Sequence, residues 1–310
     1  MIHLAGLSLD MDSVASHLEG YGFPRPPDDG VAYTVALPRI LELLARTDAR
    51  ATFFLIAEEA RGHPEAVRRI VAEGHEVASH SMTHRLPFVD LDPQARQLEI
   101  NSSKALLEDL SGQEVSGFRA PSWDAGPWLT SHLVEAGYHY DSSAYPSIFL
   151  LALRAAVARR GQRSKRHTGR RVWSAALGPR KLSRIQTRGG SLVEVPMYTI
   201  PVLRVPYYHT LRFVLPGVLF RWIRRIAQAP HQAVWYQFHA VDFLSMGDRL
   251  DRRIARHPGM RVPSGRKLEL AAEAVRALGH KRTVIPLREL IAARFGALRL
   301  DMQLAAKESA

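Results

Sequence analysis

Short apolar segments with strand character alternate with helix-like segments through most of this chain. The clearest examples are a strand at 51–56, a helix at 64–73, a strand at 76–79 and a helix at 129–136. This order predicts an α/β architecture with parallel strands, because a helix between two strands returns the chain to the same end of the sheet. With 310 residues, 46% of them hydrophobic, the chain can bury one large core, and we expect a single domain over 1–310.

Composition limits the compartment and the chemistry. The chain has no cysteine, which excludes disulfides and thiolate ligands. Its first residues, Met1 to Leu4, lack the charged segment and the long apolar run of a secretory signal. No stretch reaches the roughly 18 uncharged apolar residues that a spanning helix needs. We therefore expect a cytoplasmic protein, soluble or peripheral on the inner face of the membrane.

Two histidines four residues apart, His80 and His84, follow the strand at 76–79. Imidazole suits Zn²⁺ and its first-row neighbours, so the pair makes half of a metal site. Since the chain has 14 histidines, the alternative is a chance pair, with one ring capping a turn and the other on the surface. A zincin motif is excluded, because Ser81 stands where its glutamate must be.

Two carboxylates end the first predicted strand, at 4–9. Strand alternation points Asp10 and Asp12 to the same side, where like charges repel unless a cation or a shared proton relieves them. A metal ligand and a general base would satisfy this arrangement, and the alternative is a turn with two solvated aspartates. Asp28-Asp29-Gly30 imitates the pair, but prolines precede it instead of a strand, so we expect a loop there.

Two further segments place polar side chains at strand ends. Arg119 follows an amphipathic helix predicted at 93–110 and can orient a carboxylate bidentately. Pro121 then leaves unpaired backbone N–H groups behind it. The aromatic strand at 234–238 ends in His239, and a histidine at such a position is typical of a general acid or base.

The chain resembles the polysaccharide deacetylases, the NodB-homology carbohydrate esterases, in the order of its motifs. These motifs are Asp-x-Asp, His-x-x-x-His, Arg-x-Pro and a late strand ending in histidine. The supporting phrases are Arg50–Phe54, Gly74–Val77, Tyr140–Ser143 and Val193–Pro196. The resemblance runs from Leu7 to Phe243, with a weaker tail towards Leu290. It implies a distorted, incomplete (β/α) barrel of the NodB-homology type with a basic insert, and ligands at the carboxyl ends of its strands.

The resemblance also implies a metal centre and a base. Asp12, His80 and His84 would bind a divalent metal, most simply Zn²⁺, with other first-row divalent metals as alternatives. Asp10 would take a proton from water whose pKa the cation lowers. Arg119 would hold Asp10 in place.

The remaining implied roles concern the oxyanion and the leaving group. The backbone N–H after Pro121, that of Ser122, would help to bind the oxyanion, and Trp123 would belong to the same substrate wall. His239 would protonate the leaving amine.

The chain departs from the family pattern in three ways. Met11 separates two aspartates that are adjacent in most of the family and separated in a subset of it. Ser122 stands where an aromatic residue usually follows Arg-x-Pro, which should reshape the substrate wall. The aspartate and tryptophan that usually tune the catalytic histidine have no clear counterpart.

Positive charge is concentrated in one part of the chain. Residues 151–190 contain twelve Lys and Arg and no Asp or Glu, whereas the rest carries thirty of each sign, so the net charge of +12 lies there. We expect a basic and apolar insert at about 148–190 and an amphipathic basic stretch at about 204–226. These segments are compatible with a solvated loop followed by an ordinary barrel helix, with a nucleic-acid groove, or with docking on an anionic membrane. Aromatic residues mixed with basic ones favour the membrane, and no nucleic-acid-binding motif accompanies the charge.

The combined hypothesis is a metal-dependent hydrolase that removes an N-acetyl group from an amino sugar, lipid-linked or part of a cell-envelope glycan precursor. The expected partners are an N-acylated amino sugar or glycolipid and an anionic membrane surface. The enzymatic alternatives are a deformylase of a lipid-linked formamido sugar and a deacetylase of peptidoglycan or another polymer. An inactive scaffold that binds polyanions or membranes would lack a catalytic group. The expected ligands and catalytic residues are all present, namely Asp10, Asp12, His80, His84, Arg119 and His239.

Overall fold

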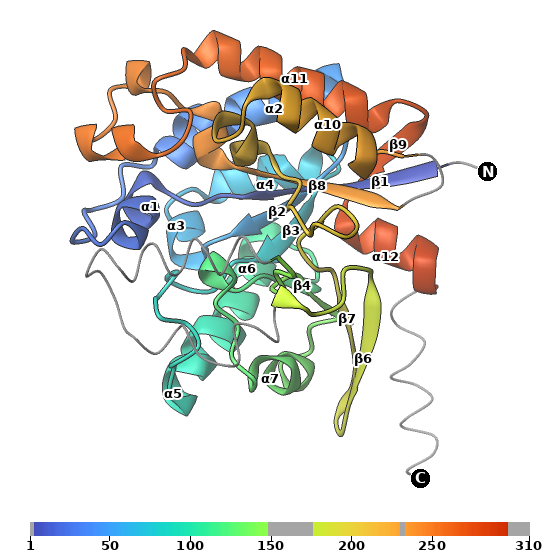
Figure 1. The fold of residues 1–310 in the computed structure, drawn as a ribbon. Helices are drawn as coiled ribbons and strands as arrows, with labels where there is room; N and C mark the ends of the chain where they lie inside the picture. The colour runs from blue at the N-terminus through green and yellow to red at the C-terminus, as the bar shows by residue number, and fades with distance from the viewer. Residues whose placement is uncertain (1–2, 148–175, 230–232, 297–310) are drawn as a thin grey trace.

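The computed structural model describes residues 3–147, 176–229 and 233–296. Its centre is one sheet with the strand order β6-β7-β5-β4-β3-β2-β1-β8, and β9 pairs with β1 (Figure 1). All pairings are parallel except that of β6 with β7. The strands are β1 (His3–Asp10), β2 (Thr52–Leu55), β3 (Glu76–Ser79), β4 (Gly117–Phe118), β5 (Tyr140–Asp141), β6 (Ser183–Thr187), β7 (Gly190–Glu194), β8 (Val234–His239) and β9 (Arg282–Ile285).

Helices surround the sheet. In the view of Figure 1, α2, α10 and α11 lie above β1 and β8, and α6 and α7 lie below β1 and β2. The helices are α1 (Val14–Gly20), α2 (Leu37–Arg46), α3 (Ala57–Arg61), α4 (Pro64–Ala72), α5 (Pro93–Arg96), α6 (Ser103–Ser111), α7 (Leu129–Glu135), α10 (Gly217–Ala227), α11 (Ser264–Gly279) and α12 (Leu287–Phe295). None of the helices in the described ranges combines the length and the apolar character needed to span a bilayer.

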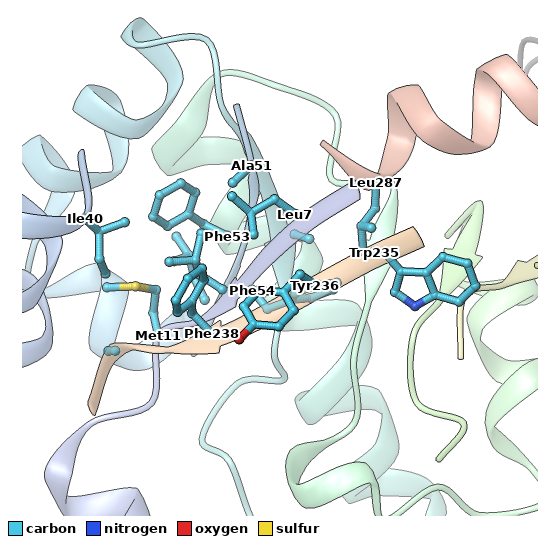
Figure 2. Close-up of a cluster of buried hydrophobic side chains, with 14 of the residues drawn as sticks. Leu7, Met11, Ile40, Ala51, Phe53, Phe54, Trp235, Tyr236, Phe238 and Leu287 are labelled. Atoms are coloured by element: carbon cyan, nitrogen blue, oxygen red, sulfur yellow. The ribbon is translucent and has the colours of Figure 1, made fainter. Parts of the chain in front are cut away.

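The core is built on the three central strands. β2 and β8 flank β1, and side chains of all three, among them Leu7, Phe53, Phe54 and Phe238, are almost fully buried (Figure 2). Burial on both faces explains why these strands are continuous apolar runs without alternation. A Cβ at Gly6 would lie 2.9 Å from the side chains of Leu287 and Leu290 on α12, so the close packing of that helix requires glycine.

The predicted architecture is confirmed: the fold is α/β with a parallel sheet, and the barrel is incomplete because the sheet does not close. The helix predicted at 93–110 is one helical run made of α5, a π-helical turn at Gln97–Ser102, and α6. Leu98, counted as apolar in that helix, is 49% exposed. The segment containing Asp28, Asp29 and Gly30 is a loop, as predicted.

The predicted basic insert at 148–190 lies largely outside the described residues, which resume at Ala176. Its last part forms β6, which makes a hairpin with β7 at the edge of the sheet. The amphipathic stretch predicted at 204–226 contains a 3₁₀ helix, His209–Phe213, and most of α10.

Candidate active site

The polar residues singled out in the sequence gather at the carboxyl ends of four strands. Asp10 ends β1 and His239 ends β8, and the two are register partners. His80 follows β3, and Arg119 follows β4. These four residues and Asp12 are all buried, each no more than 8% exposed. Parallel strands bring their carboxyl ends to one edge, which is where barrel enzymes place their chemistry.

Asp12, His80 and His84 form a compact set of metal-ligating groups. Asp12 Oδ1 lies 3.2 Å from His80 Nε2 and 3.8 Å from His84 Nε2. Among the described residues, this is the one group of three whose possible ligand atoms lie within 4.8 Å of one another. One carboxylate and two imidazoles suit Zn²⁺ or another first-row divalent ion.

Three further observations fit a bound cation. Asp12 Oδ1 is buried and accepts no hydrogen bond. His80 Nδ1–H donates to the Arg119 carbonyl oxygen at 2.7 Å, which leaves the Nε2 lone pair for a ligand. Burial lowers the pKa of His84 to about 3, so this imidazole is neutral at physiological pH, the form that binds metals. The residues present therefore fit a divalent metal.

A buried carboxylate that sequence reasoning missed braces the loop between the two imidazoles. Glu99, 1% exposed, accepts hydrogen bonds from the backbone N–H groups of Met82 at 3.1 Å and Thr83 at 3.0 Å. This support is needed because Ser81 and His84 adopt left-handed backbone conformations, with φ of 70° and 57°. An acidic residue on the buried side of an amphipathic helix was the available signal.

Asp10 is held from two sides. Arg119 Nη1 donates to Asp10 Oδ1, and Gln237 Nε2 donates to Oδ2 at 2.7 Å. The Arg119 guanidinium is itself fixed by donation to Ser142 Oγ at 2.8 Å and by stacking 3.9 Å from the centre of the Phe54 ring. The predicted pairing of Arg119 with Asp10 is present in the structure, and Gln237 is an additional partner that sequence reasoning missed.

His239 has its own supporting pair, Thr210 and Asp242. Thr210 Oγ1 lies 3.2 Å from His239 Nδ1 and donates to Asp242 Oδ1 at 3.0 Å. Asp242, fully buried, also accepts from the His239 backbone N–H at 2.9 Å. Burial opposes protonation of His239, but the hydrogen bond to Asp242 and the charge of Asp10 outweigh it, so its pKa is raised.

Asp242 lies where an aspartate could contact the His239 ring. The sequence alone did not identify an aspartate beside this histidine, and in the structure Asp242 follows His239 by three residues, in a 3₁₀ turn. Thr210 reaches the site from the segment that precedes α10. The sequence signal was an aspartate close behind a strand-ending histidine, whereas Thr210 had none.

The segment after Pro121 forms an aromatic wall one residue later than expected. The Trp123 ring stands perpendicular to the His239 ring at 5.9 Å and packs 5.0 Å from Tyr145. Ser122 and Trp123 both have left-handed φ angles, 53° and 51°, which shape this turn. In the part of the chain that the structure describes, no backbone carbonyl accepts from the Ser122 N–H, and its oxyanion role stays a prediction.

Two more buried imidazoles lie behind the site. The His17 ring lies 6.3 Å from that of His239 and 4.8 Å from that of His257. Tyr21 Oη and His257 Nδ1 are 2.8 Å apart. Burial lowers the pKa of both His17 and His257, so they are neutral neighbours of the more basic His239. Sequence reasoning did not single them out.

An open pocket of about 730 Å³ includes Thr83 in its lining, and Thr83 lies between the two imidazole ligands in the sequence. Arg25 crosses it, donating to the Thr83 carbonyl oxygen at 2.6 Å and to Glu59 Oε1 at 2.9 Å. The other lining residues are Glu19, Asp28, Asp29, Gly30, Glu58, Gly62, His63 and Arg85.

Comparison with known families agrees with the motifs. Residues 28–140 match the polysaccharide deacetylase family model. This span holds His80, His84 and Arg119. The pairings of β1 with β2, β2 with β3 and β3 with β4 bring them to the same edge of the sheet as Asp10 and His239, which lie outside the span. The family resemblance expected from the sequence is confirmed.

Individual relatives align over parts of their length. The chain is 32% identical to the peptidoglycan deacetylase of Helicobacter pylori over 144 residues, which are 45% of this chain and 49% of that protein. It is 49% identical to a chitooligosaccharide deacetylase of Sinorhizobium fredii over 57 residues, 18% of this chain and 26% of that protein. The chain thus spans half or less of the length of these curated relatives.

Solved structures share the fold over nearly the whole chain. A Mycobacterium smegmatis protein described as a polysaccharide deacetylase superposes with a TM-score of 0.59 at 18% identity, covering 94% of this chain and 90% of that one. PuuE allantoinase superposes with the same TM-score at 15% identity, covering 94% and 91%. At these identities the likeness shows the fold alone.

Proposed function

We propose that this chain, of which residues 28–140 match the polysaccharide deacetylase family model, is a metal-dependent hydrolase that removes the N-acetyl group of an amino sugar in a cell-envelope glycan or its precursor. One observation carries the proposal: the ligand set Asp12, His80 and His84 is assembled beside the pair formed by Asp10 and His239. A hydrolytic amidase needs this combination of a cation site, a base and an acid.

Asp12, His80 and His84 would hold the metal. When bound, such an ion polarises the amide carbonyl and lowers the pKa of water, which is the Lewis-acid part of amide hydrolysis. The chain contributes the fixed donor geometry: the bond from His80 Nδ1 to the Arg119 carbonyl sets the tautomer, and Glu99 holds the intervening loop.

Asp10 would act as the general base that removes a proton from the attacking water. Its carboxylate is oriented by Arg119 on one oxygen and Gln237 on the other, so the side chain loses little freedom during the reaction. The N–H of Ser122, which has no backbone acceptor among the described residues, is the proposed second donor to the oxyanion.

His239 would give a proton to the leaving nitrogen. The amide C–N bond breaks, a C–O bond from water forms, and the products are acetate and a free amino sugar. Asp242 and Thr210 favour the protonated imidazole and fix its Nδ1 side, which leaves Nε2 directed to the side of Asp10, 3.7 Å from Oδ2.

The test is product identification with purified protein after metal analysis. Wild-type protein should contain about one divalent ion per chain and release acetate from N-acetylglucosamine oligomers or glycolipids. His80→Ala should lose metal and turnover together, whereas Arg68→Ala, on the exposed side of α4, should keep both. A matched panel of N-acetyl and N-formyl amino sugars separates the two enzymatic alternatives. Release of formate and not of acetate would show that the substrate carries a formyl group. If purified wild-type protein contains no divalent ion and releases neither acetate nor formate, the proposal is contradicted.

A further inference from the structure

Exposed apolar side chains are concentrated on one short segment of the structure. Among the described residues, eight large hydrophobic side chains are exposed, and four of them lie on α10 or just before it. These four are Val214, Val218, Leu219 and Trp222, with exposed fractions of 57%, 71%, 42% and 45%. The other side of α10 is anchored in the core by Phe220, Ile223 and Ala227. The exposed side is therefore a fixed surface of the fold, and Figure 1 shows the helix α10 itself above β1 and β8.

Two arginines lie among these apolar side chains. Arg221 and Arg225 are exposed, and at helical spacing they neighbour Val218 and Trp222. Within the described ranges, no acidic side chain pairs with either guanidinium, whereas Arg224 on the same helix is paired with Glu273. We call the set Val214, Val218, Leu219, Arg221, Trp222 and Arg225 the α10 face. It combines unpaired positive charge with apolar groups.

We propose that the α10 face docks on the surface of an anionic lipid bilayer. Tryptophan and short aliphatic side chains partition into the headgroup boundary, and unpaired arginines beside them meet lipid phosphates. A second copy of the chain is a poorer occupant, because a twofold contact through this face would bring Arg221 and Arg225 against the same arginines. At eleven residues, α10 can lie along the bilayer surface but cannot cross it.

Docking on a bilayer also bears on the substrate, and this consequence rests on the proposed function. The α10 face follows directly in sequence after Tyr208 and Thr210, whose side chains lie beside His239. Docking through α10 would hold the site near the bilayer, as a lipid-linked amino sugar requires.

Vesicle sedimentation tests the docking itself. The full chain is mixed with phosphatidylcholine vesicles, with or without about one third phosphatidylglycerol, at about 0.1 M salt. The apolar variant is Val218→Ser with Trp222→Ser, and the charge variant is Arg221→Glu with Arg225→Glu. The matched control, Arg68→Glu with Arg69→Glu, makes the same change of charge on exposed positions of α4.

We expect wild-type protein and control to bind the anionic vesicles, and both α10-face variants to partition about tenfold less. Equal sedimentation of wild-type protein and both variants would overturn the proposal, as would equal binding to vesicles without phosphatidylglycerol. Dimerisation that Trp222→Ser abolishes, without vesicle binding, would assign the face to a second copy instead. Acetate release from a soluble substrate should be unchanged in every variant, so loss of docking and failure of the proposed function are distinguishable.

Discussion

Asp10 and His239 are register partners on the neighbouring parallel strands β1 and β8, and Asp10 Oδ2 lies 3.7 Å from His239 Nε2. Each ends its strand, so both side chains are carried by rigid elements. Their surroundings separate their roles: Asp10 accepts from Arg119 and Gln237, whereas His239 rests on Thr210 and Asp242. A base and an acid are thus held side by side, next to the metal-ligating set.

The first prediction separates the base from the metal ligands. Asp10→Asn keeps the size and the acceptor oxygen that Arg119 needs but removes the basic carboxylate, so turnover should fall about 100-fold or more. Metal content, measured by inductively coupled plasma mass spectrometry, should stay at the wild-type level. His80→Ala should lower both quantities. Loss of metal in Asp10→Asn would make Asp10 a ligand instead of a base.

The second prediction concerns the pH profile. The carboxylate of Asp242 raises the pKa of His239, so Asp242→Asn should lower it. The protonated acid would then be lost at lower pH, and the basic limb of the kcat profile should move towards lower pH. Thr210→Val should move the basic limb of the kcat profile towards lower pH as well. Thr210→Ser, which keeps the hydroxyl, should return the limb to its wild-type position. An unshifted basic limb in Asp242→Asn, with circular dichroism like that of the wild type, would rule out this role.

The third prediction concerns stability. Asp141 and Glu194 are buried register partners on β5 and β7, and burial raises the pKa of Asp141 to about 7 and that of Glu194 well above its usual value. A raised carboxyl pKa favours folding at low pH, and this contribution is lost as the pH rises from the unfolded-state pKa through the folded one. Thermal unfolding should therefore shift down by a few degrees between about pH 5 and pH 8.

The matched variants for this effect are Asp141→Asn and Asp109→Asn. Asp141→Asn removes one of the two buried acids and should flatten the pH dependence. Asp109→Asn, at an exposed position on α6, should leave it as in the wild type. A wild-type Tm that rises with pH over the same range would contradict the assignment.

Site residues could be predicted from the sequence where their own segment marked them, and not where only the tertiary fold brings them to the site. Asp10 and His239, which end strands, and His80, which follows one, could be identified from the sequence, because an apolar run followed by a polar side chain is visible there. Parallel strands gather such residues at one edge of the sheet. Gln237 and Thr210 could not be identified in this way. Gln237 lies inside a buried strand, and Thr210 comes near His239 only through the path of the chain before α10.

The same limit applied to the surface. Mixed basic and aromatic residues predicted an amphipathic stretch at 204–226, but composition alone does not tell which arginines are paired. The structure pairs Arg212 and Arg224 with Glu273 on α11 and leaves Arg221 and Arg225 outside that contact. Pairing across helices is a tertiary property, so the exposed cationic positions required the fold.

The last prediction tests whether Glu99 acts through the metal-ligating loop. Its carboxylate binds the N–H groups of Met82 and Thr83 and so holds the residues between the imidazoles in a strained conformation. Glu99→Leu keeps a similar bulk but removes Oε2, the single oxygen that accepts from both N–H groups. Metal affinity, measured by competition with a chelator, should fall about 10- to 100-fold, as for other groups that orient ligands. Because Glu99 does not touch the proposed base or acid, kcat at saturating metal should recover to near the wild-type value. Asp109→Asn on the same helical run is the control, and a kcat that stays low at saturating metal would show that Glu99 does more than position the ligands.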